Sequence, residues 1–523
     1  MKNNNILITN NSREYIISQQ IFNSLLFFKT KKSMLKYLKL VKTIFLICTI
    51  FLITYSCKKN NNSNTSQKVA ENTSKKQGSL ELKPNIIVIL IDDAGYVDFG
   101  FMGSKDLETP EIDKLAKSGV IFTDAHVSST VCAPSRAGII SGKYQQRFGF
   151  EANHTGDESS GDLDLGDNIP TIATVFKQNN YKTIALGKWH LGATESDHPN
   201  NRGFDEFYGF LAGGRSYFPI AKPSKEHMLQ HNSKRVKFDG YLTDVLGDYS
   251  LKFIEENKNE PFFMYLAYNA VHTPMHAKKE HLEKYKNHPR QKLAAMTWSL
   301  DENVGKLTKK LKDLNLLDNT LIYFLSDNGG AKTNTSNNGH LKGWKGNKFE
   351  GGHRVPFVMS WPKQIEANQK FDGLTSSLDI FTTSIAAAGI QKNKDLQLDG
   401  TNLMPFVKKE KIGNPHTDLY WRKLDESGAR YNNLKLVKLK DYGSVLYDLS
   451  NDISETKDLS KLDPQNLELL DSNLSKWEDK MMPPLWKEEK EWMDVTYHIH
   501  QRLMQNKEVL YTEPIKGIKV SEK

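Results

Sequence analysis

Cysteine is almost absent from this chain, with three residues among 523. Cys48 lies within an apolar leader and Cys57 lies directly after it, so Cys132 is the one cysteine in the remainder. A lone cysteine cannot form an intramolecular disulfide, which excludes a disulfide-stabilised scaffold for the folded part. An unpaired cysteine of this kind marks Cys132 as a candidate reactive residue.

The part of the chain that folds carries no net positive charge. The net charge is +9, but residues 1–56 contribute +7 and residues 57–78 contribute +4, which leaves residues 79–523 at −2. Proteins that bind nucleic acid usually present a basic face on their folded part. We therefore predict no nucleic-acid binding, despite a sequence pI of about 9.0.

The apolar run of the leader is short. It covers 13 residues, 43–55, whereas a membrane-spanning helix needs about 20. Lys36, Lys39 and Lys42 precede it, and a basic stretch before a short apolar run is typical of a signal peptide. Met34 stands just before these lysines and is a candidate alternative start. The sequence predicts an exported protein, with residues 1–57 as leader and signal peptide.

Cys57 follows a small residue at the end of the apolar run, as in the lipid-attachment site of bacterial lipoproteins. We predict a lipid anchor at Cys57 and a location in the periplasm or on the outer membrane. Cleavage at a nearby position, or an uncleaved anchor, is the alternative. Residues 58–80 are mostly polar and predict a flexible linker.

Short apolar runs alternate with helical patterns in residues 81–405. The runs at 85–91, 183–186, 262–268 and 321–325 show no polar alternation, which is typical of strands buried on both faces. Helices are predicted at 171–178 and 293–314. The fold class is therefore α/β, with a large, mostly parallel sheet between layers of helices. Residues 406–523 predict a smaller subdomain, with antiparallel strands at 431–436 and 443–449 and a helix at 464–480.

Oxygen-bearing side chains follow two of the predicted buried strands. Asp92 and Asp93 come after the first strand, and Asp327 and Asn328 come after the strand at 321–325. Either pair alone is more often a turn or a helix cap. Because ligands bind at the carboxyl edge of parallel sheets, two such pairs favour a site for a hard divalent cation such as Ca²⁺ or Mg²⁺.

Cys132 opens the segment C-A-P-S-R at 132–136. Pro134 suits the first turn of a helix, which places Cys132 at a helix N-terminus, and Arg136 lies about one turn further on. This segment resembles the signature of the formylglycine-dependent type I sulfatases, which belong to the alkaline-phosphatase-like superfamily.

The resemblance covers about residues 84–460. Besides the aspartate pair, its blocks are G-K-W-H-L-G at 187–192, R-G-F-D at 202–205, H-T-P at 272–274, S-D-N-G at 326–329, K-G-N-K-F-E-G-G at 345–352 and Y-D-L at 447–449. One departure is S-G-K at 141–143, where the family often has Thr-Gly-Arg.

The resemblance implies a role for each matching residue. A maturation enzyme would oxidise Cys132 to formylglycine (3-oxoalanine), whose hydrate attacks sulfur and then expels sulfate. One Ca²⁺ would be bound by residue 132 with Asp92, Asp93, Asp327 and Asn328. The remaining implied residues are Arg136, Lys188 and Lys345 for the sulfate, His190 for a hydroxyl of the hydrate, and His272 as substrate contact and general acid.

The substrate is less well defined by sequence. Export and the family resemblance favour a sulfated polysaccharide of the ulvan or carrageenan type, with glycosaminoglycans as the second choice. Arg215, Tyr217 and Trp344 are candidate substrate contacts. Two other functions stay open: a phosphate or phosphonate ester hydrolase of the same superfamily, and a glycan-binding surface lipoprotein with a degenerate site.

Overall fold

The computed structural model describes residues 83–153, 165–166 and 168–509. The chain divides into two units, Met1–Ser79 and Leu80–Lys523, and all described residues belong to the second. The signal peptide, Cys57 and the linker lie outside the described residues, so the predictions made for them stay predictions. Within the described ranges, no helix has both the length and the apolar character needed to span a bilayer.

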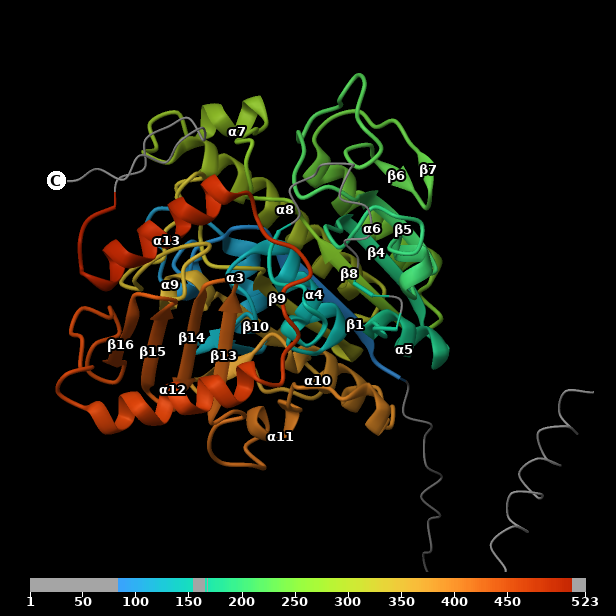
Figure 1. Cartoon of the computed structure of the whole chain (residues 1–523). Coiled ribbons are helices and arrows are strands. Elements are labelled where there is room, and N and C mark those ends of the chain that lie inside the picture. The colour runs from blue at the N-terminus through green and yellow to red at the C-terminus, as the bar shows by residue number, and fades with distance from the viewer. Residues whose placement is uncertain (1–82, 154–164, 167, 510–523) are drawn as a thin grey trace, which may run out of the picture. The chain divides into compact units, whose positions relative to one another are not determined.

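A ten-stranded sheet forms the centre of the second unit (Figure 1). Its strands follow one another in the order β11 (Gln369–Phe371), β2 (Val120–Phe122), β10 (Phe357–Ser360), β9 (Thr320–Ser326), β1 (Asn85–Ile91), β8 (Phe262–Ala267), β4 (Lys182–Lys188), β5 (Glu206–Phe210), β6 (Gln230–His231) and β7 (Lys234–Arg235). The run β9–β1–β8–β4–β5 is parallel throughout. The predicted parallel α/β sheet is therefore confirmed.

Alternate residues of β1 pack into two separate cores, one on each face of the sheet. Ile86, Val88 and Leu90 belong to the core that includes residues of α4 (Cys132–Ser141), α5 (Ile172–Gln178) and α10 (Asp379–Ala387). The intervening isoleucines belong to the core of α3 (Pro110–Lys117), α6 (Leu242–Glu256) and α8 (Gln291–Asp313). Helices on both faces explain why the strand is apolar at every position.

Three short helices and a two-stranded sheet complete the larger part of the unit. They are α7 (Lys279–Lys284), α9 (Glu350–His353), α11 (Met404–Val407), and the pair β3 (Ala125–His126) with β12 (Thr375–Ser376).

A second, antiparallel sheet follows, made of β13 (Asp418–Lys423), β14 (Glu426–Tyr431), β15 (Leu434–Leu439) and β16 (Gly443–Asp448) (Figure 1). The helix α12 (Pro464–Glu478) packs with one set of sheet residues, and α13 (Lys490–Met504) packs with another set that includes Trp344 and Phe349. The strand predicted at 431–436 is wrong in its bounds. It spans the turn between β14 and β15, where Asn432 has a φ of 49°, which strand residues do not adopt.

A buried polar network joins this sheet to α9 and β3. His126 and His353 share a hydrogen bond of 2.9 Å between their Nδ1 atoms, and Lys435 from β15 lies 2.5 Å from Nε2 of His353. Arg430 from β14 pairs with Glu350 at 3.1 Å. Lys435 also pairs with Glu350 at 3.4 Å, and Nε2 of His126 lies 2.8 Å from Asp124, so this buried cluster ties β14 and β15 to α9 and β3.

Candidate active site

The predicted polar residues lie together at the carboxyl ends of the parallel strands. Asp92 and Asp93 follow β1, Asp327 and Asn328 follow β9, and Lys188 is the last residue of β4. All five are buried. Parallel strands bring their carboxyl ends to one edge, so residues more than 200 positions apart in sequence become neighbours.

Cys132 is the first residue of α4, as the position of Pro134 predicts. Its Sγ lies 3.6 Å from Oδ1 of Asp92 and 4.0 Å from Oδ1 of Asp93. Burial raises the pKa of the Cys132 thiol to about 12, although Lys188 and Lys345 oppose the shift. An unmodified Cys132 in this arrangement is therefore a protonated thiol at neutral pH, which is a weak nucleophile.

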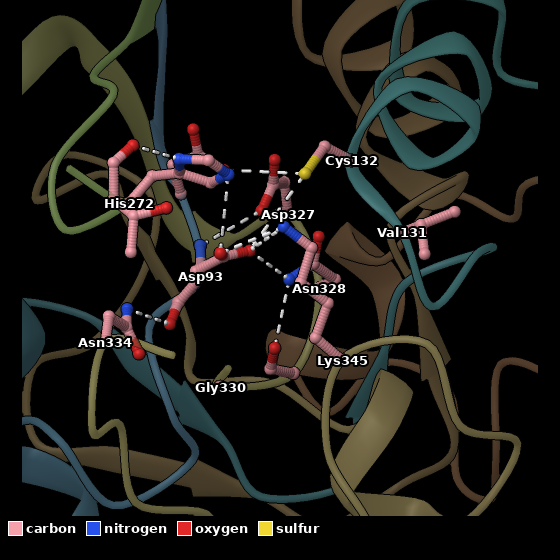
Figure 2. A network of polar contacts seen from close by, with 12 residues as sticks. Asp93, Val131, Cys132, His272, Asp327, Asn328, Gly330, Asn334 and Lys345 are labelled. Carbon is pink, nitrogen blue, oxygen red and sulfur yellow. Dashed lines mark hydrogen bonds and ion pairs between the residues drawn. The ribbon is translucent and has the colours of Figure 1, made fainter. Parts of the chain in front are cut away.

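Asp93 is the centre of the polar network (Figure 2). Its carboxylate accepts a 2.7 Å hydrogen bond from Nδ2 of Asn328, and Nζ of Lys345 lies 2.7 and 2.9 Å from its two oxygens. Nε2 of His272 lies 3.6 Å away. Burial raises the pKa of Asp93, but Lys345 and His272 outweigh it and hold that pKa well below its usual range.

Asp92 and Asp327 are balanced by two further cations. Nζ of Lys188 lies 2.7 Å from Oδ2 of Asp92. The guanidinium of Arg136 lies 2.8 to 2.9 Å from Oδ2 of Asp327 and donates a 3.0 Å hydrogen bond to the carbonyl of Lys188. Burial and the nearby Asp92 raise the pKa of Asp327. The site therefore concentrates three carboxylates that repel one another.

This donor set fits a hard divalent cation. Three carboxylates and an amide supply oxygen ligands only, which Ca²⁺ and Mg²⁺ prefer. The amide oxygen of Asn328 is buried and has no hydrogen-bond partner among the described residues. Ligand atoms of Asp92, Asp93, Cys132 and His272 all lie within 4.8 Å of one another. An unsatisfied buried oxygen beside converging carboxylates is the arrangement that a cation stabilises.

The two predicted histidines border the same site. Nδ1 of His272 lies 2.6 Å from the carbonyl of Thr273, which leaves Nε2 facing Asp93. His190 comes two residues after Lys188, and its buried Nδ1 has no hydrogen-bond partner in the part of the chain that the structure describes. Burial lowers the pKa of His190 most, and the positive charge of Lys188 lowers it further, so that this pKa lies well below its usual range. Both rings are therefore neutral in this arrangement, since burial also lowers the pKa of His272 to about 3.

Several supporting residues escaped the sequence analysis. Asn334 and Ser336 donate hydrogen bonds of 3.1 and 2.9 Å to the carbonyl of Asp93, whose φ is 66°. Few residues adopt that conformation without local support. The signal was present as an asparagine-rich stretch, 334–338, soon after Gly329 and Gly330.

The candidate substrate contacts occupy different places. The hydroxyl of Tyr217 donates a 2.8 Å hydrogen bond to the carbonyl of His272, so Tyr217 positions that loop. Arg215 is buried, and its guanidinium lies over the rings of Phe210 and Phe238. Trp344 packs against the second sheet and borders a cavity beside the site. Lys143, at the position where the family often has arginine, has Arg147 and Asp399 as its charged neighbours.

That cavity has a volume of about 360 Å³ and connects the catalytic centre to the C-terminal helix. Asp93, His272 and Lys345 line one part, and residues of α13 line another. Its size lies within the range of about 300–1,000 Å³ typical of ligand sites. The site can therefore hold a molecule larger than a sulfate group.

Comparison with known proteins gives consistent matches over most of the chain. Residues 84–390 match the family described as Sulfatase, and residues 342–504 match the one described as N-sulphoglucosamine sulphohydrolase, C-terminal. The uncharacterized sulfatase YdeN of Escherichia coli K12 is 33% identical over 65% of this chain and 68% of its own length. The human N-acetylgalactosamine-6-sulfatase is 31% identical over 63% of this chain and 66% of its own length.

A solved structure, Ps i-CgsB, is 40% identical with a TM-score of 0.74, over 80% of this chain and 98% of that one. The fold of this chain is accordingly the alkaline-phosphatase-like fold found in sulfatases. The family match, the curated relatives and the oxygen-rich site at the sheet edge lead to one conclusion: the chain belongs to the sulfatase family and is a sulfuric ester hydrolase.

Proposed function

We propose that this enzyme removes sulfate esters from a sulfated polysaccharide of the carrageenan type, or from oligosaccharides derived from it. The observation that carries the proposal is the 40% identity to Ps i-CgsB, which was also crystallised with k-i-k-neocarrahexaose, by its name a carrageenan hexasaccharide. The cavity beside the catalytic centre supports it, because that cavity has room for sugar as well as sulfate.

The proposal includes formylglycine at position 132 and one Ca²⁺ per chain. Asp92, Asp93, Asp327, Asn328 and residue 132 would hold the cation, which when bound withdraws electron density from sulfate oxygens. The hydrated aldehyde of residue 132 supplies a hydroxyl nucleophile together with a second hydroxyl that allows sulfate to leave. A formylglycine-generating maturation enzyme is then a required partner.

The remaining residues bind the sulfate and move a proton. Lys188, Lys345 and Arg136 place positive charge where negative charge accumulates on the transferring group. His190 would hold a hydroxyl of residue 132. His272 would give a proton from Nε2 to the oxygen of the leaving sugar, because its Nδ1 is already engaged by the carbonyl of Thr273. A bound sulfate raises the pKa of His272, since negative charge favours the protonated ring.

A panel of defined substrates tests this proposal. Sulfate release is measured on carrageenan, ulvan and glycosaminoglycan oligosaccharides, alongside 4-nitrophenyl sulfate and 4-nitrophenyl phosphate. We expect the highest kcat/KM on a carrageenan oligosaccharide. Cleavage of aryl sulfate alone would contradict the polysaccharide assignment, and a preference for phosphate would favour the alternative hydrolase. A phosphonate monoester hydrolase shares the fold at 18% identity, so fold alone does not decide between them. Glycan binding without turnover would indicate a degenerate site.

We also propose that Cys57 carries a lipid that anchors the enzyme outside the cytoplasm. Its place after the short apolar run supports this assignment. Cys57→Ser is expected to move the protein from the membrane fraction to the soluble fraction. Without the lipid, only the polar linker at 58–80 precedes the folded part, and a polar segment does not hold a protein in a membrane. Cell fractionation with immunodetection measures the shift, with Cys48→Ser as the matched control. Wild-type protein that is already soluble would contradict the anchor.

A further inference from the structure

The cavity beside the catalytic centre has a wall that the mechanism above does not use. Besides Asp93, His272 and Lys345, it is lined by Trp492, Val495 and Ile499 of α13. These residues come from the C-terminal segment, about 400 positions after Asp93. The transferring sulfate occupies only the part of the cavity lined by the catalytic residues. The part lined by α13 is therefore available to the rest of the substrate.

Trp492 stands out among the aromatic residues. It is 41% exposed, whereas the other seven tryptophans, all among the described residues, are buried or half-buried. It lies in the first turn of α13 and borders the cavity. A large indole is normally buried because its apolar surface is costly to leave in water. A flat apolar ring at a cavity that also holds polar groups suits the C–H face of a sugar.

Polar groups on the same wall suit the hydroxyl groups of that sugar. Lys423 and Glu488 both line the cavity and pair at 2.7 Å, with only 3% and 6% of their surfaces exposed. A buried pair of this kind keeps unused donors and acceptors that a ligand can engage. Asn153 also lines the cavity.

The charge of the lining favours an anionic ligand. Lys332, Lys345 and Lys423 contribute three positive charges, against Asp93 and Glu488. Lys332 is exposed, and its Nζ lies 5.2 Å from the centre of the Trp344 ring. A second anionic group on the substrate would find this lysine available.

We propose that α13 forms a second sugar subsite. The sugar next to the sulfated ring stacks on Trp492 and bonds to Lys423 and Glu488, and Lys332 contacts an anionic substituent of the chain. The inference rests on the proposed polysaccharide substrate and adds where the neighbouring sugar binds. It predicts that the C-terminal subdomain contributes to discrimination between glycans and small sulfate esters, which do not reach this wall.

Kinetics of Trp492→Ala on two substrates test the subsite. For a sulfated oligosaccharide of at least four sugars, KM is expected to rise about tenfold with kcat nearly unchanged, because stacking stabilises substrate and transition state alike. For 4-nitrophenyl sulfate, both constants should stay at the wild-type level. Trp492→Phe should recover most of the oligosaccharide affinity. Tyr442→Ala is the matched control, since Tyr442 is a similarly exposed aromatic, 38%, outside the cavity lining.

Binding to the inactive Cys132→Ala background gives a second readout that does not depend on turnover. Calorimetry should show oligosaccharide binding weakened about tenfold by Trp492→Ala. Unchanged KM and affinity in Trp492→Ala, or an equal loss on both substrates, would overturn the subsite while leaving the proposed function in place. Absence of sulfate release from every oligosaccharide by the wild-type enzyme would instead overturn the proposed function, and the subsite with it.

Discussion

Cys132→Ala is expected to fold and to bind the cation while losing about 10⁴-fold or more of kcat/KM. The side chain at position 132 lies at the start of α4, within 3.6 Å of Asp92 and 4.0 Å of Asp93, where the sulfate and cation would meet. Alanine removes the proposed nucleophile and leaves every cationic side chain in place. Sulfate release on the best oligosaccharide measures the loss, and circular dichroism confirms the fold.

Ile139→Val provides the matched control on the same helix. Ile139 is fully buried in the core beneath α4, so the substitution perturbs packing by about 0.5–1.5 kcal/mol without touching the site. It should keep turnover close to wild type. Activity in Cys132→Ala equal to that of the control would mean that another residue is the nucleophile.

Asp327→Ala is expected to lose bound calcium and at least about 10³-fold of turnover. Asp327 would supply one of the carboxylates of the cation site, and it also lies 2.8 Å from the guanidinium of Arg136. Alanine leaves that buried guanidinium without its nearest carboxylate, so a fall in stability of about 3–5 kcal/mol accompanies the loss. Elemental analysis of folded protein measures the calcium content.

Chelation of the wild-type enzyme separates the loss of calcium from the loss of the ion pair, because Arg136 and Asp327 both remain. Removal of metal should abolish turnover and lower the melting temperature, since Asp92, Asp93 and Asp327 then repel one another without the ion. Re-addition of Ca²⁺ should restore both. Full activity in protein shown to be free of metal would contradict the cation assignment.

Local sequence patterns predicted the parallel sheet and the sheet edge at which the site residues lie. The runs at 85–91 and 321–325 indicated buried strands, and the residues that follow them meet at one sheet edge. Pro134 placed Cys132 at a helix start. These inferences succeeded because each depends on spacing within one segment or on the general geometry of parallel strands.

Contacts between segments far apart in the sequence could not be predicted from local patterns. The asparagine-rich stretch 334–338 marks a polar segment, but it does not indicate that the amide of Asn334 supports Asp93, about 240 residues earlier. Tyr217 looked like a substrate contact, but its hydroxyl contacts the carbonyls of Asn269 and His272. The helix α13 was missed because charged residues dominate 487–494, although Val495, Ile499 and Leu503 recur at helical spacing.

The mass of the peptide that contains residue 132, in enzyme purified in its active form, tests the central claim most directly. Sulfate hydrolysis at this site is attributed to an aldehyde made from Cys132, at a position where burial keeps an unmodified thiol protonated. We predict a peptide lighter than its coded mass that reacts with hydrazides, in a proportion that rises with specific activity. Fully active enzyme whose Cys132 is an unmodified thiol would contradict the account.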